Sequence, residues 1–268
     1  MGNTEPFAGT ALQKAVLSRL KPGNPFALEV YEEIGSTNDR AKALAACGAP
    51  AWTAVLARRQ RGGRGRLERS FYSPAGGVYL SLLLRPDCGA ADAGLFTAAA
   101  AVAACRAVSA LCGKECRIKW PNDLLFEGKK VGGILTEAGL GQNGRFSFMV
   151  VGVGLNLRLP SGGFPPELSD AGALLQPGAA GPSFAKAAAA LLEALYALLS
   201  VAPDRRFLSE YCERSALTGK SLLVLQGDLK RTAAALGIDE NAGLCVEYPD
   251  GTRETLRSGE IGIRESRC

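Results

Sequence analysis

Two long apolar segments with helical character lie among short β-prone runs, and this mixture constrains the fold more than any other feature of the chain. The helical segments cover residues 94–111, which are rich in alanine, and 183–199. Shorter helices are expected at 10–21, 41–47 and 204–212, with Ser36 or Thr37 capping the second of these. Strands are expected at Leu28–Tyr31, Thr53–Arg58, Gly77–Leu84, Arg117–Trp120, Leu124–Phe126, Val131–Glu137 and Phe146–Leu157. The mixture predicts an α+β domain.

The pattern changes at Gly219, where long elements give way to short strands separated by glycine, aspartate and asparagine turns. The expected strands are Ser221–Leu225, Arg231–Leu236, Gly243–Tyr248 and Arg253–Leu256. Such spacing is typical of a small all-β barrel. We therefore predict two domains in the 268 residues, 1–217 and 218–268.

The composition of the chain argues against several classes of function. The chain has no histidine, which excludes a Ser-His-Asp triad, a histidine-ligated metal and a histidine general base. None of the eight cysteines forms a CxxC pair, and the spacing of Cys105, Cys112 and Cys116 fits no zinc-finger pattern. No charge-free apolar run reaches the length of about 18 residues that a membrane span needs. The N-terminus lacks the pattern of a secretory signal, so we expect a cytoplasmic protein with free thiols.

The net charge of +5 comes from one short stretch. Residues 58–69 hold six arginines and one acid, Glu68, which leaves the rest of the chain neutral. Within this stretch, Gln60-Arg61-Gly62-Gly63-Arg64-Gly65-Arg66 uses arginine and never lysine. Guanidinium groups bind phosphate or carboxylate in a bidentate manner, and the glycines let the backbone approach an anion. The loop fits three interpretations: a flexible lid over a phosphorylated ligand, an RGG-like nucleic-acid patch, or a solvated loop.

Two further segments are unusual for the interior of a sheet. Lys119-Trp120-Pro121-Asn122-Asp123 is a turn with an amide and a carboxylate, and Lys130 follows close to a glycine pair. Asp123 suits a magnesium ion with a triphosphate, and Lys130 suits a carboxylate or phosphate, but an ordinary hairpin turn fits equally well. The run Val151-Gly152-Val153-Gly154-Leu155-Asn156 has two glycines in one strand. They indicate either a close approach to the backbone or a bulged core strand.

Taken in order, these motifs closely resemble the biotin–protein ligases. The resemblance rests on Ser36-Thr37-Asn38, Gln60 to Arg66, Ser73-Pro74, Lys119–Asp123, Lys130 with Gly132-Gly133-Ile134-Leu135, and Gly152–Asn156. It extends over residues 30–264 and includes Gly219-Lys220, Gly237-Ile238-Asp239 and Gly259-Glu260-Ile261. Together with the strand pattern, it implies a class II synthetase-like catalytic domain. That domain would be a mixed, mostly antiparallel sheet with helices packed on one side, followed by an SH3-like barrel.

The resemblance also implies an activity. Family members activate biotin with MgATP to biotinyl-5′-AMP, release pyrophosphate, and transfer the biotinyl group to one lysine of a biotin carboxyl-carrier domain. The catalytic residues that it implies are Lys130, Asp123, Arg64 and Arg66. Those implied for biotin are Ser36, Thr37, Asn38, Gln60, Gly63, Arg64, Gly65, Arg66, Trp120, Lys130 and Gly133. Those implied for ATP are Arg64, Arg66, Asn122, Lys130, Asn156, Glu260 and Arg264, with Asp123 for Mg²⁺.

The chain departs from the family pattern in its arginine-rich loop. Where the family usually has a second glycine and a tryptophan, this chain has Glu68 and Phe71. Glu68 adds bulk and charge at a site that favours a positive φ, so we predict a loop that retains the intermediate less tightly.

Parts of the sequence also fit three other functions. Only 35 residues precede Ser36, which is too few for the helix-turn-helix of the repressor members, so we expect no specific DNA binding. A nucleic-acid-binding module leaves the Trp-Pro-Asn-Asp turn unexplained, and a lipoate ligase lacks this pairing of motifs. A non-catalytic biotin-binding protein is the third alternative, because of Glu68. The sequence is compatible with a monomer or a homodimer.

Overall fold

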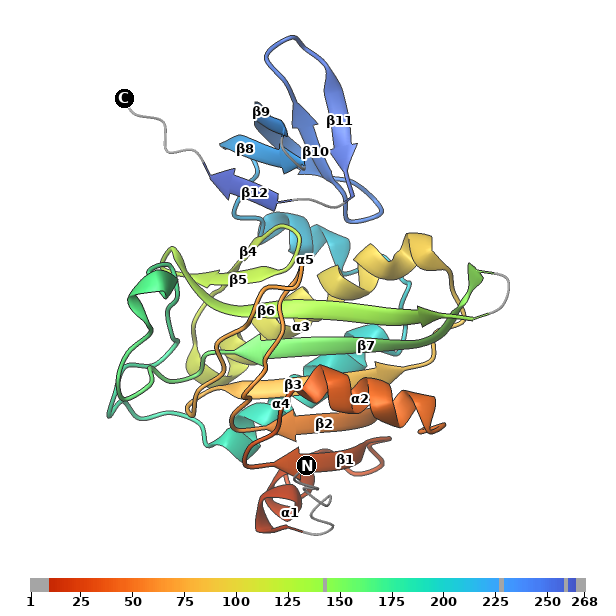
Figure 1. Cartoon of the computed structure of the whole chain (residues 1–268), viewed down its shortest axis with the longest axis vertical. Helices are drawn as coiled ribbons and strands as arrows, with labels where there is room; N and C mark the ends of the chain where they lie inside the picture. The colour runs from red at the N-terminus through yellow and green to blue at the C-terminus, as the bar shows by residue number, and fades with distance from the viewer. Residues whose placement is uncertain (1–9, 142–143, 227–228, 258–259, 264–268) are drawn as a thin grey trace.

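The computed structural model describes residues 10–141, 144–226, 229–257 and 260–263. Its main sheet has seven strands in the order β1-β2-β3-β7-β6-β5-β4 (Figure 1). Only β1 and β2 run parallel, and the other neighbours within this sheet are antiparallel, which confirms a mixed, mostly antiparallel sheet. The strands are β1 (Ala27–Tyr31), β2 (Thr53–Ala57), β3 (Val78–Leu84), β4 (Arg117–Lys119), β5 (Asp123–Phe126), β6 (Lys129–Leu140) and β7 (Phe146–Leu155).

Helices cover both faces of this sheet. On one face lie α1 (Ala11–Leu17), α3 (Ala93–Cys112) and α4 (Phe184–Leu199), and on the other lies α2 (Thr37–Ala46). Strand β2 shows why: Ala54 and Leu56 join the core beneath α3 and α4, while Val55 and Ala57 pack with the helix on the opposite face. The prediction that helices pack on one side was wrong, because every residue of β2 is buried and both of its faces need a cover.

One helix in the described part of the chain, Ala90–Cys112, is long and apolar enough, by length and composition alone, to cross a membrane. It comprises a short 3₁₀ turn, η1 (Ala90–Asp92), and α3. The alanines of α3 are buried against the sheet and against α4. Its apolar character is therefore that of a core helix, whose small side chains allow close packing.

The C-terminal strands form a second sheet at one end of the molecule, beyond β4 and β5 (Figure 1). They are β8 (Ser221–Gln226), β9 (Leu229–Ile238), β10 (Leu244–Glu247), β11 (Arg253–Leu256) and β12 (Glu260–Ile263). The order is β11-β10-β9-β8-β12, and the described residues show no pairing of β11 with β12. The structure therefore shows an open antiparallel sheet, and the SH3-like barrel stays a prediction. The sequence missed β12, and the helix expected at 204–212 is a turn followed by α5 (Leu208–Glu213).

Candidate functional site

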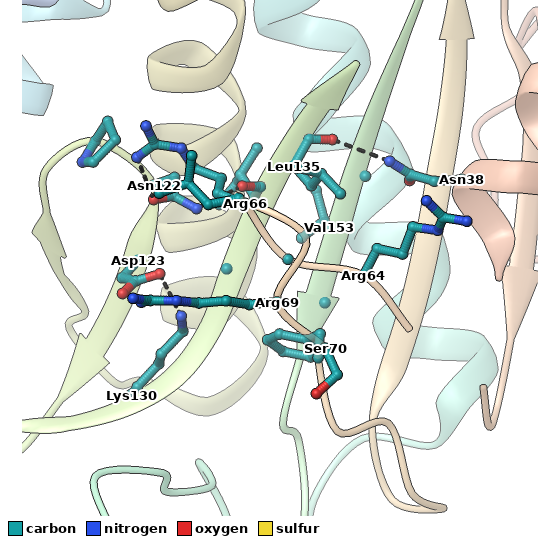
Figure 2. Close-up of a pocket in the computed structure, with 18 of the residues that line it drawn as sticks. Asn38, Arg64, Arg66, Arg69, Ser70, Asn122, Asp123, Lys130, Leu135 and Val153 are labelled. Atoms are coloured by element: carbon teal, nitrogen blue, oxygen red, sulfur yellow. Dashed lines mark hydrogen bonds and ion pairs between the residues drawn. The ribbon is translucent and has the colours of Figure 1, made fainter. Parts of the chain in front are cut away.

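A cavity of about 380 Å³ opens over β6 and β7, between the start of α2 and the loop of residues 60–73, called the arginine loop here (Figure 2). The turn of residues 119–123 closes one end. Most of the residues expected from the sequence line this cavity: Ser36, Thr37, Asn38, Gln60, Arg64, Gly65, Arg66, Trp120, Asn122, Asp123, Lys130 and Gly133. Segments about 100 residues apart thus meet at one site.

The first turn of α2 supplies a polar floor. The Ser36 side chain caps the helix by accepting a hydrogen bond from the backbone N–H of Asp39 at 3.3 Å, as predicted. Thr37 and Asn38 follow it and are buried. On the facing strand β3, Ser81 Oγ lies 2.7 Å from Thr37 Oγ1 and 2.5 Å from Asn38 Oδ1. The floor is therefore an organised set of hydroxyl and amide groups rather than an apolar surface.

The amide of Asn38 is held by β6. Its Nδ2 donates to Glu137 Oε2 at 2.7 Å and lies 3.4 Å from the carbonyl oxygen of Leu135. Glu137 also pairs with Lys42 at 2.6 Å, and Lys42 pairs with Asp39 at 3.0 Å. Burial alone lowers the pKa of Lys42, but the hydrogen bonds to the two carboxylates outweigh it and raise that pKa overall. Lys42 is thus charged, and the group of four side chains fixes the orientation of the Asn38 amide.

The arginine loop is tied to the floor at its base. Gln60 Oε1 accepts from Thr37 N at 2.8 Å, and Gln60 Nε2 donates to Ser73 Oγ at 2.9 Å. Towards its tip the loop carries Leu67 and Glu68, whose φ angles of 54° and 60° are left-handed. The positive φ inferred for position 68 is therefore confirmed, and a non-glycine residue occupies it.

Two loop arginines reach different partners, and Figure 2 shows the partner of Arg66. Arg64 Nε lies 3.1 Å from Asp39 Oδ2 on α2, and Arg66 Nη1 lies 3.5 Å from Asn122 Oδ1 across the cavity. Both side chains are in the cavity lining with Arg69. The loop thus brings three guanidinium groups to one ligand-sized space, as an anionic ligand requires.

The glycines of β7 give space to two side chains. A Cβ atom at Gly152 would collide with the amide of Asn38, and one at Gly154 would lie 2.6 Å from the ring of Phe71. A Cβ atom at Gly133 on β6 would lie 3.7 Å from the same ring, which is ordinary contact. Of the two interpretations of this strand, the structure supports the close approach to the backbone, and the groups that approach are the Asn38 amide and an aromatic ring of the arginine loop.

The opposite end of the cavity carries an ion pair. Asp123 Oδ1 and Lys130 Nζ are 2.6 Å apart on neighbouring strands (Figure 2). Asn122 is fixed beside them by two hydrogen bonds to Ile134. Its side-chain Nδ2 donates to the Ile134 carbonyl at 2.8 Å, and its backbone carbonyl accepts from Ile134 N at 2.9 Å. Asp123 is the only carboxylate in the described lining of the cavity. No group of three or more acidic or cysteine side chains in the described residues is placed to hold a metal ion.

Four predicted residues lie elsewhere or outside the description. Gly63 belongs to the arginine loop but is not in the cavity lining, and a Cβ atom there would collide with Phe71 O and Ser73 Oγ of the same loop. Asn156 is buried outside the cavity lining, and its Nδ2 donates to Gly172 O at 3.0 Å. Glu260 lies in β12, and Arg264 falls outside the described residues. In the β8–β12 register Glu260 is opposite Leu225, which does line the cavity.

Sequence reasoning missed most of the apolar wall of the cavity. It consists of Leu67, Phe71, Leu80, Ile134, Leu135, Val153 and Leu225, and the lining also includes Arg69, Ser70, Lys119, Pro121, Gly152 and Gly154. Strand alternation gave no signal for Val153, because it turns that side chain to the face opposite Gly152 and Gly154, into the core with α3 and α4. Leu225 had none, because only the packing of the second sheet against the first brings it to the site.

The comparisons with known proteins agree with this architecture. A model of the biotin/lipoate A/B protein ligase family matches residues 30–156. The biotin--[acetyl-CoA-carboxylase] ligase of Paracoccus denitrificans is 34% identical over 246 residues, covering 84% of this chain and 96% of the relative. The bifunctional ligase/repressor BirA of Bacillus spizizenii is 41% identical over 143 residues, covering 53% of this chain. The match spans 44% of the length of that Bacillus protein.

A solved structure shares the fold. The biotin protein ligase from Aquifex aeolicus in complex with biotin and ATP superposes with a TM-score of 0.72 at 25% identity, covering 88% of this chain and 98% of the other. The fold and the cavity thus define a ligase domain of the biotin or lipoate type. The chain belongs to the biotin/lipoate A/B protein ligase family.

Proposed function

We propose that the protein is an ATP-dependent biotin–protein ligase. It joins biotin to one lysine of a biotin carboxyl-carrier domain through biotinyl-5′-AMP, with release of pyrophosphate. The observation that carries the proposal is a single cavity with a floor of fixed hydroxyl and amide groups at one end and clustered cations at the other. Biotin is a molecule with a polar ureido ring at one end and a carboxylate at the other.

The floor suits the ureido ring. Ser36, Thr37, Asn38 and Gln60 offer donors and acceptors that the fold already orients, so little entropy is lost when a rigid polar ring binds. Phe71, above Gly154, provides an apolar cover for the rest of the ligand. Trp120 is only 3% exposed and contributes to the wall more than to an open surface.

The cationic end suits the chemistry of adenylation. Attack of the biotin carboxylate on the α-phosphorus forms a C–O–P bond and expels pyrophosphate, so negative charge accumulates on the phosphate oxygens. Lys130, Arg64 and Arg66 are placed to stabilise that charge, and no covalent enzyme nucleophile is needed. The arginine loop then shields the mixed anhydride from water.

A magnesium ion fits this end of the cavity. Mg²⁺ is commonly held by one or two carboxylates and by the substrate's phosphates, and Asp123 supplies one carboxylate. In the second step Asp123 orients the amine of the acceptor lysine. The amine attacks the acyl carbon, its proton passes to Asp123, and AMP leaves.

The remaining predicted residues complete the proposal. Asn156 is proposed to act near the adenine, and Glu260 and Arg264 at the nucleotide or carrier. The register of β12 supports a role for the second sheet, because it places Glu260 opposite a cavity residue. We further propose the two-domain division at 217/218, a C-terminal barrel, and action as a monomer or homodimer. Specific DNA binding is not part of the proposal.

The test is pyrophosphate release by the purified protein with MgATP, with and without biotin. A carrier domain is then added, and its mass is measured. Biotin-dependent release together with a biotinyl mass gain on one carrier lysine is the expected result. Binding of biotin without pyrophosphate release would instead identify a non-catalytic biotin-binding protein, and release with lipoate alone would identify a lipoate ligase.

A further inference from the structure

The turn of residues 119–123 is held by three separate elements of the fold. Asn122 is hydrogen-bonded to Ile134 on β6, and the carbonyl of Pro121 accepts from the Tyr211 hydroxyl of α5 at 3.1 Å. The third contact crosses to the C-terminal sheet: Trp120 Nε1 donates to the carbonyl oxygen of Ala242 at 2.9 Å, and this hydrogen bond is buried. Trp120 precedes Asp123 by three residues, so the second sheet contacts the chain directly beside the cation-rich end of the cavity.

The carbonyl that Trp120 contacts belongs to a specially built turn. Ala242 has a left-handed φ of 61°, which is unfavourable for a residue with a side chain. Asp239 compensates for it: its Oδ1 accepts from the backbone N–H groups of Asn241 at 2.9 Å and Gly243 at 2.7 Å. Burial raises the pKa of Asp239, but hydrogen bonds from Arg257 and from the two N–H groups lower it overall, so the carboxylate stays charged. This gives a structural role to the Gly237-Ile238-Asp239 motif, whose residues do not line the first cavity.

The surroundings of Trp120 make this hydrogen bond significant. A second cavity of about 710 Å³ lies at the junction between the catalytic domain and the C-terminal sheet. Trp120, Pro121 and Tyr211 line it on one side, and Asn241, Ala242 and Gly243 line it on the other. The junction is therefore not tightly packed throughout. Where packing is incomplete, a directional hydrogen bond fixes relative position more than apolar contact does.

We propose that Trp120 is a positioning residue through which the C-terminal sheet holds the 119–123 turn, and with it Asp123, in its working position. This inference rests on the proposed ligase function. The indole N–H acts through the turn and not on the substrate. Its loss is expected to slow the chemical steps without weakening biotin binding.

The test replaces Trp120 with Phe, which keeps an aromatic ring but removes the donor. Trp52→Phe is the matched control, because Trp52 packs on Phe26 and Tyr196 outside the described lining of both cavities. We expect kcat for carrier biotinylation to fall about tenfold in Trp120→Phe, with KM for biotin within about twofold of wild type. Trp52→Phe is expected to keep both constants. A rise in KM for biotin at unchanged kcat would overturn the proposal and make Trp120 part of the biotin wall.

A second variant approaches the same contact from the other side. Asp239→Asn weakens the turn that presents Ala242 O, so it is expected to lower kcat in the same manner. In the double variant the two effects should be far from additive, because both act through one hydrogen bond. Full additivity would contradict the proposal.

Amide hydrogen exchange gives a readout that does not depend on catalysis. Peptides covering 119–124 should exchange faster in Trp120→Phe than in wild type, while peptides over α2 stay unchanged. If wild type releases no pyrophosphate, the ligase proposal fails, and this measurement alone decides the positioning role. Unchanged exchange at 119–124 would reject it.

Discussion

The arginine loop and the 119–123 turn face each other across one cavity, yet they are built in opposite ways. The loop is anchored at its base by Gln60, and its tip carries two left-handed residues, of which Leu67 is 66% exposed. The turn is hydrogen-bonded to β6, α5 and the C-terminal sheet. A loop with an exposed tip and a turn held on three sides suit the proposed ligase function, in which the loop admits ligands and then excludes water.

The largest expected effect comes from the fixed side. Lys130→Ala removes the lysine that pairs with Asp123. We expect biotin-dependent pyrophosphate release to fall about 100-fold or more, because the developing phosphate charge loses a preorganised cation. The control is Lys129→Ala, since Lys129 Nζ donates to the Ser169 carbonyl outside the described lining of the cavity. Equal losses in both variants would remove the special role of Lys130.

A smaller effect is expected where the floor is fixed by β6. Glu137→Gln keeps the shape but weakens the pairing with Lys42 and allows the Asn38 amide to reorient. KM for biotin should rise about fivefold while KM for ATP stays within about twofold, since the proposed function assigns the floor to the ureido end of biotin only. Isothermal titration with biotin provides an independent check. A rise in KM for ATP alone would place Asn38 at the other end of the ligand.

The support beneath the turn should be sensitive to acid. Glu210 lies next to Tyr211 and pairs with Arg106 at 2.7 Å and Arg214 at 2.9 Å. Burial raises the pKa of Glu210, but the two arginines lower it overall. Because the pKa of Glu210 is lower in the folded protein than in the unfolded chain, the ion pairs stabilise the fold at a pH above the unfolded-state pKa, near 4.5. This stabilisation is lost as the pH falls through the folded-state pKa of Glu210.

Glu210→Gln measures that contribution. At pH 7 its free energy of unfolding should be about 1 kcal/mol lower than that of wild type. The difference should shrink as the pH falls below 4.5. Urea unfolding at several pH values provides the measurement. A difference that stays constant with pH would show that the ion pairs contribute no pH-dependent stability.

The smallest effect concerns the arginine loop. Glu68→Gly relieves a left-handed φ and is expected to stabilise the observed loop conformation by about 1 kcal/mol or less, since glycine also gains freedom in the unfolded chain. Release of bound biotinyl-AMP should slow by up to about fivefold, as followed by rapid filtration.

Glu127→Gly is the matched control for this variant. Glu127 also has a left-handed φ, of 50°, but lies outside the described lining of the cavity. Both variants should show a small rise in Tm, and only Glu68→Gly should change release. An unchanged release rate in Glu68→Gly would mean that the strain at the loop tip does not govern retention.

The sequence predicted local features with good accuracy. Ser36 caps α2, the left-handed φ occurs at position 68, and the glycines of β7 do admit close neighbours. Each of these depends on a few adjacent residues, because caps, φ preferences and strand alternation are short-range properties. Most of the predicted site residues do line the cavity, including the facing partners Asp123 and Lys130, but much of its apolar wall was not among them.

Only the tertiary structure decided what those local features contact. It placed α2 alone on one face of the sheet, seated Phe71 on Gly154, brought Leu225 to the cavity, and directed the Trp120 indole to Ala242, 122 residues further along the chain. Contacts of this kind depend on strand order and on how two sheets pack. No short-range pattern encodes them, because they arise when distant apolar surfaces are buried together.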